Sequence, residues 1–150
     1  MTLTRVPRGA NAFGAASVLV VDDNRDGREM LSEYLSSSGF VVDTAVDGGE
    51  AVEMARRLHP SAIVMDLMMP RMGGWEATRH LKADARTREI RIIVMTANAQ
   101  SEERQVAREA GCAGFLLKPC DLDQVAAMLR RVIEQRGRSG VGKALRRPIA

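Results

Sequence analysis

Short, largely apolar runs recur five times along the chain, and each run is only four or five residues long. Apolar runs of this length are typical of strands that are buried on both faces of a sheet. Most of them are rich in valine or isoleucine, which also favour strands. They predict strands at residues 17–21, 41–45, 62–65, 91–95 and 114–117.

Segments with a helical period lie between these runs. Apolar residues three and four positions apart form stripes that would face a core. The stripes consist of Met30, Leu31, Tyr34 and Leu35; of Ala51, Val52, Ala55 and Leu58; and of Val125, Met128, Leu129, Val132 and Ile133. Asp47 and Glu50 have the spacing of a capping box, and Asp121 and Gln124 repeat it before the last stripe. Ser101 opens a further helix.

Strand and helix therefore alternate five times. This order predicts an α/β fold with a five-stranded parallel sheet, strand order 2-1-3-4-5, and helices on both faces, the flavodoxin-like arrangement. We expect a flexible leader over residues 1–16, one domain over 17–135, and a basic, disordered tail over 136–150, where the apolar stripe has ended.

Composition narrows the class of protein. With 45% hydrophobic and 27% charged residues the chain has the composition of a soluble globular protein. It has no apolar run near the roughly 20 residues of a membrane span. The N-terminus lacks the apolar core of a secretory signal, so we expect a cytoplasmic protein. Cys112 and Cys120 have no CxxC spacing, which argues against zinc and against a disulfide framework.

Charge is spread unevenly along the chain. Of the net charge of +3, residues 130–150 carry +6 and residues 1–8 carry +2, which leaves −5 on residues 9–129. The basic balance thus belongs to the two ends, and it is weak support for nucleic-acid binding by the folded part.

Polar residues follow the predicted strands. Asp22 and Asp23 come after the first strand, Asp66 after the third, Thr96 after the fourth and Lys118 after the fifth. In open parallel sheets ligands bind at the carboxyl ends of the strands, where the strand order reverses. The predicted order makes strands 1, 3, 4 and 5 contiguous, so these residues would line one cleft.

Three carboxylates brought together repel one another unless a cation neutralises them. Mg²⁺ fits, because it takes one or two carboxylates together with water and phosphate oxygens, and no histidine or cysteine joins the set. Lys118 and Thr96 suit a phosphoryl group, as a compact cation and a hydroxyl donor. Asp66 stands alone at the end of the central strand, which makes it the better nucleophile, while Asp22 and Asp23 suit metal binding.

Four motifs give the chain a resemblance to a known family: "VLVVDDN" (18–24), "IVMDLMMPRMGG" (63–74), "IIVMTANA" (92–99) and "AGCAGFLLKP" (110–119). In their order and spacing the chain resembles the receiver domain of two-component response regulators, and it is similar to the single-domain chemotaxis type. The resemblance implies an aspartyl-phosphate switch that assists its own phosphorylation and dephosphorylation but is not an enzyme acting on other substrates. Its partners would be a sensor histidine kinase or phosphotransfer protein and a downstream protein target.

Residue by residue, the resemblance implies Asp66 as the phosphoacceptor. It further implies Mg²⁺ on Asp22, Asp23, Asp66 and the backbone carbonyl of Met68. Thr96 and Lys118 would contact the phosphoryl oxygens. Phe115 falls at the position of the switch aromatic, whose rotation follows the threonine and alters the face formed by the fourth helix, fifth strand and fifth helix. The resemblance also implies a cis bond between Lys118 and Pro119.

Other functions remain open at this point. Singly, Asp22 or Asp23 could cap the following helix, and Asp66 could cap a turn. An aspartate-nucleophile phosphatase has a similar layout but places DxDx[TV] after the first strand, where this chain has "DDNRD" (22–26). A module that keeps the fold without phosphorylation is a third possibility. Only about 15 residues follow the last predicted helix, so we expect no DNA-binding domain and an output through partners.

Overall fold

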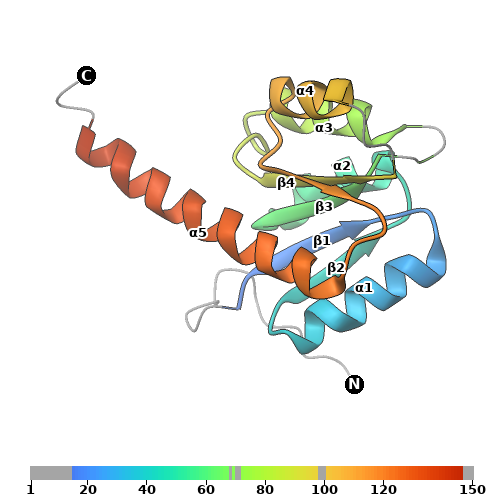
Figure 1. The fold of residues 1–150 in the computed structure, drawn as a ribbon. Coiled ribbons are helices and arrows are strands. Elements are labelled where there is room, and N and C mark those ends of the chain that lie inside the picture. Colours follow the sequence, from blue (N-terminus) through green and yellow to red (C-terminus); the bar gives the residue numbers. More distant parts are fainter. Residues whose placement is uncertain (1–14, 68, 70–71, 98–100, 147–150) are drawn as a thin grey trace.

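The computed structural model describes residues 15–67, 69, 72–97 and 101–146, with side chains except at 101–103 and 136–146. Strands and helices alternate along this part of the chain, as predicted (Figure 1). The elements are β1 (Ser17–Val21), α1 (Arg25–Ser37), β2 (Val41–Ala45), α2 (Gly48–Leu58), β3 (Ala62–Asp66), α3 (Gly74–Ala83), β4 (Arg91–Thr96), α4 (Ser101–Glu109), β5 (Gly114–Leu117) and α5 (Leu122–Arg146). In the described residues, no helix is both long and apolar enough to cross a membrane.

The strands form one parallel sheet in the order β2-β1-β3-β4-β5, which confirms the predicted topology. The predicted bounds of β1, β2 and β5 match the structure. β3 and β4 each run one residue further than predicted and end on polar residues. The reason is pairing: Asp66 still lies opposite Met95, and Thr96 lies opposite Leu117. The two polar residues are therefore part of the sheet rather than of the loops.

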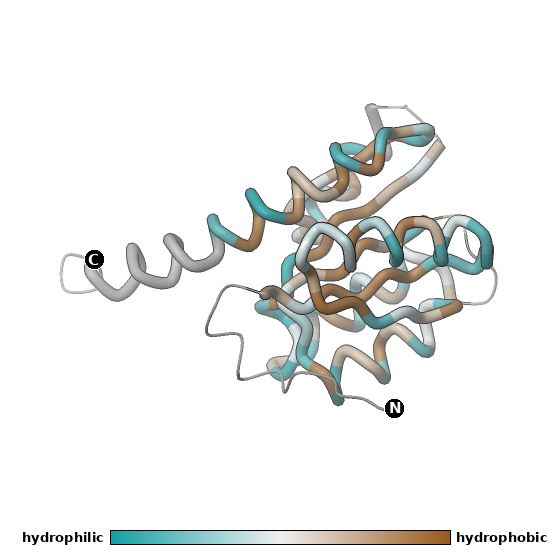
Figure 2. Tube along the Cα trace, turned by 90° about the horizontal axis from the view of Figure 1, so that it is seen from below, coloured by the Kyte–Doolittle hydropathy of each residue, from teal (hydrophilic) through white to brown (hydrophobic). Residues whose placement is uncertain are grey.

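Helices cover both faces of the sheet (Figure 1). Neighbouring strand residues serve opposite faces, because side chains alternate along a strand. Ile63 belongs to the core cluster under α2, α3 and α4, whereas Val64 belongs to the cluster under α1 and α5. Figure 2 shows the hydrophobic strands enclosed by helices whose outer sides are hydrophilic. Met30, which the sequence places in the apolar stripe of α1, is an exception, being 58% exposed.

Local hydrogen bonds define the helix starts. The carboxylate of Asp47 accepts from the N–H of Glu50 at 2.8 Å, and Glu50 in turn accepts from the N–H of Val46 at 2.8 Å. This is a capping box, as predicted, with the return bond displaced by one residue. α1 is capped by Asn24, whose side chain accepts from the N–H of Gly27 at 2.9 Å. The cap of α1 is thus neither Asp22 nor Asp23, and both acids are left for other roles.

The last helix is longer than the sequence pattern predicts. α5 continues to Arg146, past residue 135, where its apolar stripe ends. The helical backbone over 136–146 differs from the predicted disordered tail. No proline lies between Leu122 and Pro148 to stop the helix, although the segment contains three glycines, which are poor helix formers. The predicted leader is described only at residues 15 and 16, and its flexibility and the proposed domain bounds stay predictions.

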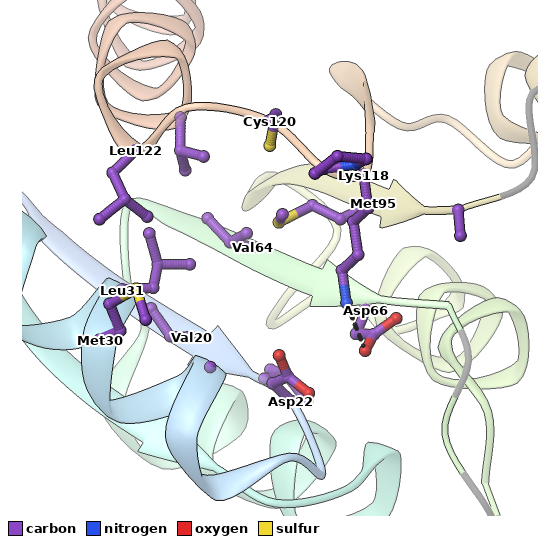
Figure 3. A pocket seen from close by; sticks show the side chains of 15 residues that line it. Val20, Asp22, Met30, Leu31, Val64, Asp66, Met95, Lys118, Cys120 and Leu122 are labelled. Atoms are coloured by element: carbon purple, nitrogen blue, oxygen red, sulfur yellow. Dashed lines mark hydrogen bonds and ion pairs between the residues drawn. The ribbon is translucent and has the colours of Figure 1, made fainter.

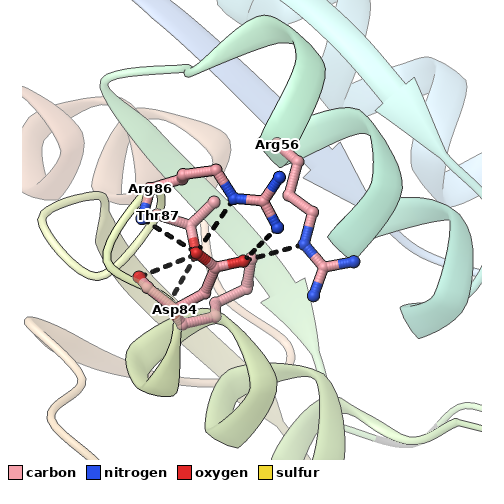
Figure 4. Close-up of polar contacts among 5 residues, drawn as sticks. Arg56, Asp84, Arg86 and Thr87 are labelled. Carbon is pink, nitrogen blue, oxygen red and sulfur yellow. Dashed lines mark hydrogen bonds and ion pairs between the residues drawn. The ribbon is translucent and has the colours of Figure 1, made fainter.

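A cluster of charged side chains joins α2 to the end of α3 (Figure 4). The carboxylate of Asp84 accepts from Nε of Arg56 at 2.9 Å and from Nη2 of Arg86 at 2.9 Å. Hydrogen bonds from the side chain and N–H of Arg86, and then from Arg56, hold the pKa of Asp84 well below its usual value. Thr87, beside them, donates its hydroxyl to the carbonyl of Leu81 at 2.7 Å. These bonds fix the turn that leads into β4.

The start of α3 lies very close to the end of β3. A β-carbon added at Gly74 would sit 2.8 Å from the carbonyl oxygen of Asp66 and 2.9 Å from Cα of Leu67. Both contacts are to backbone, which cannot move without moving the strand. Glycine at position 74 is therefore what lets α3 begin against the end of the central strand.

We predict that Gly74→Ala lowers the free energy of unfolding by about 1–3 kcal/mol, because the added methyl group overpacks this contact. Gly49→Ala, in the first turn of α2, is the control. Its β-carbon would come no closer than 3.5 Å to Asp47. It should leave stability unchanged or raise it by up to about 1 kcal/mol. Urea denaturation of the two variants would measure the difference, and equal effects would show that the close contact carries no strain.

Candidate functional site

The carboxyl ends of four neighbouring strands bring the predicted polar residues to one edge of the sheet. Asp22 and Asp23 follow β1, Asp66 ends β3, Thr96 ends β4 and Lys118 follows β5. β2, which contributes none of them, lies at the outer edge beyond β1. The structure thus places these residues together as the topology predicts, and their chemical roles stay predictions.

Asp66 and Lys118 form the central contact of this edge. Nζ of Lys118 lies 3.0 Å from Oδ2 of Asp66, although 52 residues separate the two in sequence (Figure 3). The carboxylate is nearly buried, with 6% of Asp66 exposed. A buried charge is costly unless it is paired, so the lysine compensates this carboxylate.

The backbone places Lys118 next to Thr96. The N–H of Lys118 donates to the carbonyl of Thr96 at 2.7 Å, and Thr96 itself is buried. The bond between Lys118 and Pro119 is cis, as the resemblance implies. The end of β4 and the start of the β5–α5 loop are therefore joined at the site.

The three acids form a compact cluster. One carboxylate oxygen from each of Asp22, Asp23 and Asp66 lies within 4.8 Å of the others. Burial, and secondarily the charge of Asp66, raise the pKa of Asp22, while the N–H of Asn24, donating to Asp22 at 2.9 Å, opposes the rise. An all-oxygen set at this separation fits a hard divalent cation such as Mg²⁺. Met68, the carbonyl ligand that the resemblance implies, lies outside the described residues.

Two residues that the sequence reasoning missed shape the acidic loop. Asn24 caps α1 and also donates its N–H to Asp22. Arg28, one turn into α1, donates from Nη1 to the carbonyl of Asp22 at 2.9 Å. An asparagine directly before a helical segment is a recognisable cap signal. The contact from Arg28 has no comparable sequence signal, because it depends on how the loop turns.

Phe115 connects this edge to α4. It lies opposite Val94 in the sheet and packs, partly buried, against the core cluster under α2, α3 and α4. The guanidinium of Arg104, on α4, stands over its ring, 5.0 Å from the centroid. A cation at this distance is attracted to the face of an aromatic ring. The position of this ring therefore affects how α4 packs beside β5.

Fold and site together define a doubly wound α/β domain that gathers three carboxylates and one lysine at the switch point of its sheet. Residues 18–130 match the family described as "Response regulator receiver domain". The chain belongs to this family of two-component signalling domains.

Curated relatives and solved structures agree with the family. The chain is 39% identical over 118 residues to the response regulator MprA of Mycobacterium leprae, a match that covers 79% of this chain and 51% of that protein. The chain therefore spans about half the length of such relatives.

Among solved structures, chemotaxis protein CheY4 of Vibrio cholerae has a TM-score of 0.75 and 32% identity, covering 79% of this chain and 99% of that one. The receiver domain of sensor histidine kinase PA1611 from Pseudomonas aeruginosa PAO1 has a TM-score of 0.74 and 33% identity, covering 81% and 99%. That structure contains a magnesium ion coordinated in its active-site cleft.

We predict that Asp22→Asn stabilises the protein at pH 7 when a chelator removes metal ions. Because the pKa of Asp22 is raised in the folded state, ionising this carboxyl group costs stability. The cost grows as the pH rises from 3.8, the ordinary pKa of the group, through its raised pKa in the folded protein. The gain should be no more than about 1 kcal/mol, since solvent screens a partly exposed group. It should disappear below the ordinary pKa.

Asp26→Asn is the matched control, since Asp26 is an exposed acid in the first turn of α1. Removing its charge should lower stability slightly, because a negative charge favours a helix N-terminus. Urea denaturation across a pH series would compare the two variants. A loss of stability in Asp22→Asn at pH 7 would contradict the prediction.

Proposed function

We propose that Asp66 accepts a phosphoryl group from the phosphohistidine of a sensor histidine kinase or phosphotransfer protein. The observation that carries the proposal is the contact between Asp66 and Lys118 within the acid cluster. A carboxylate oxygen of Asp66 would attack phosphorus, so that an O–P bond forms while the P–N bond of the donor breaks. The released imidazole nitrogen keeps the electron pair.

The neighbouring residues would supply the charges that this transfer needs. Lys118 would move from the carboxylate to a phosphoryl oxygen, since its amine is a compact cation that is already at the site. Thr96 would donate its hydroxyl to a second phosphoryl oxygen. Asp22, Asp23 and Asp66, with the carbonyl of Met68, would hold Mg²⁺, which when bound neutralises the developing negative charge.

The proposed output is a change in the face formed by α4, β5 and α5. Thr96 and Lys118 are joined through their backbones, and Phe115 lies three residues before Lys118 on β5. Movement of Thr96 toward the phosphoryl group would let the Phe115 ring shift beneath Arg104. Phosphorylation is then a shift of population between two packings of α4 against β5. A downstream protein that prefers one packing would read the signal.

In this proposal the protein works in the cytoplasm as a regulated acceptor, and it does not turn over separate substrates. An aspartate-nucleophile phosphatase is the alternative from the sequence. The pairing of Asp66 at β3 with Lys118 favours the acceptor, because the phosphatase pattern places its nucleophile after β1. Sustained turnover of a phosphoester by the purified chain would favour the phosphatase instead.

We predict that incubation with acetyl phosphate and Mg²⁺ adds the mass of one phosphoryl group, and that Asp66→Asn abolishes the adduct. Asp47→Asn is the control, since asparagine caps a helix about as well as aspartate and the fold should be kept. Intact-protein mass spectrometry would score all three proteins. An adduct that persists in Asp66→Asn would assign the acceptor role to another residue.

We predict that one Mg²⁺ binds per chain in a calorimetric titration. Asp22→Asn and Asp66→Asn should each weaken binding at least about tenfold, because each removes a charged ligand. Asp26→Asn should bind Mg²⁺ as the unmodified chain does. The affinity for Mg²⁺ should fall as the pH is lowered toward the raised pKa of Asp22, because protons then compete with the metal for that carboxylate. Equal affinity in all four proteins would place the metal elsewhere.

A further inference from the structure

A cavity opens beside the acid cluster, between α1 and the start of α5. Its volume is about 440 Å³, within the range of about 300–1,000 Å³ in which small-molecule sites usually fall. Its floor includes Val64 of β3, and its sides include Leu31 of α1 and Leu122 of α5. Figure 3 shows Leu31, Leu122 and Val64 gathered in one part of the view and the carboxylates of Asp22 and Asp66 in another.

The cavity has two chemically different parts. Most of its lining is aliphatic or sulfur-containing, from β1, β3, β4, α1 and α5. The charged groups, Asp22, Asp66 and Lys118, lie together at one end. With Asp23 beside them, one lysine stands against three carboxylates, so this end is negatively charged overall. A ligand that matches both parts must have an apolar body and a positively charged head.

We propose that this cavity binds a small amphiphilic cation whose head is a guanidinium or amidinium group. Such a planar head donates several hydrogen bonds in a fixed geometry that suits carboxylates. It would contact Asp22 and Asp66, while an apolar body of a few carbons would lie against Val64, Leu31 and Leu122. Burial of that body would add binding energy that an inorganic cation cannot gain.

The ligand and a divalent metal ion would compete, because both use the carboxylates of Asp22 and Asp66. This makes the cavity an inhibitory site for any reaction at Asp66 that needs the metal. The inference stands on the shape and charge of the cavity and goes beyond the proposed phosphoryl transfer. A binding measurement without phosphodonor therefore tests it separately.

The test uses hexylguanidinium as the probe, with hexan-1-ol and hexanoate as matched neutral and anionic controls. Calorimetric titration of the chelator-treated chain should show hexylguanidinium binding at least tenfold more tightly than either control. Adding Mg²⁺ should raise its apparent dissociation constant progressively. Asp22→Asn should weaken the guanidinium several-fold and leave hexan-1-ol unchanged, because only the charged head contacts that residue.

Two variants test the apolar part. Leu122→Trp and Met30→Trp each enlarge a lining side chain, from α5 and from the exposed side of α1. Each should reduce hexylguanidinium binding at least tenfold. Val106→Trp, on α4 and away from the cavity lining, is the matched control and should bind as the unmodified chain does. A thermal melt of each variant separates lost binding from lost folding. If one of the two tryptophan variants that fill the cavity fails to fold, the other still tests the proposal.

The two free cysteines give an independent readout. Cys120 lines the cavity, whereas Cys112 lies in a separate hollow beside Phe115. Hexylguanidinium should slow alkylation of Cys120 and leave that of Cys112 unchanged. Equal affinity for hexan-1-ol, tighter binding of hexanoate, or unchanged binding in both filled variants would overturn the inference. Probe binding without phosphorylation by acetyl phosphate would overturn the proposed function and leave this inference standing.

Discussion

A carboxylate buried at the end of the central strand is the constraint on which the rest of the structure depends. Asp66 is 6% exposed, and its charge is compensated by Lys118 at 3.0 Å. The lysine can reach it only if β4 and β5 are paired beyond β3 in the observed order. The pair therefore links the correct assembly of half the sheet to the electrostatics of the site, because without the lysine the buried carboxylate of Asp66 would lose this compensating charge.

Under the two proposals, the faces of the sheet would serve different purposes around this pair. Toward α1 and α5 the site opens into the cavity, and the loop that carries Asp22 is held by Asn24 and Arg28. Toward α4, Phe115 and Arg104 form the contact that would carry a signal outward. Ligands would thus enter beside α1 and α5, whereas the Phe115–Arg104 contact lies on the α4 side of the sheet.

Much of this arrangement follows from sequence, because short apolar runs and their punctuation fix the strands and their order. The polar residues after four strands predict one shared edge once that order is known. Asn24 before α1 is a recognisable cap signal, but sequence could not show that Met30 is exposed or that Arg28 holds the acidic loop. These features depend on how a loop turns and how a helix is rotated on the sheet. The cavity is the feature that the sequence predicts least, since it depends on the spacing between α1 and α5.

The close contact at Gly74 has a mechanical consequence. The end of β3 is held by the hydrogen bond from Leu67 to Met95 at 2.9 Å on one side and by the start of α3 on the other. Asp66 is thereby a fixed point, against which other parts of the molecule can be displaced. Under the proposed function, adjustment to a phosphoryl group on Asp66 would come from Lys118, Thr96 and the acidic loop. In such a change β3 would keep its position, and the segments around its end would move relative to it.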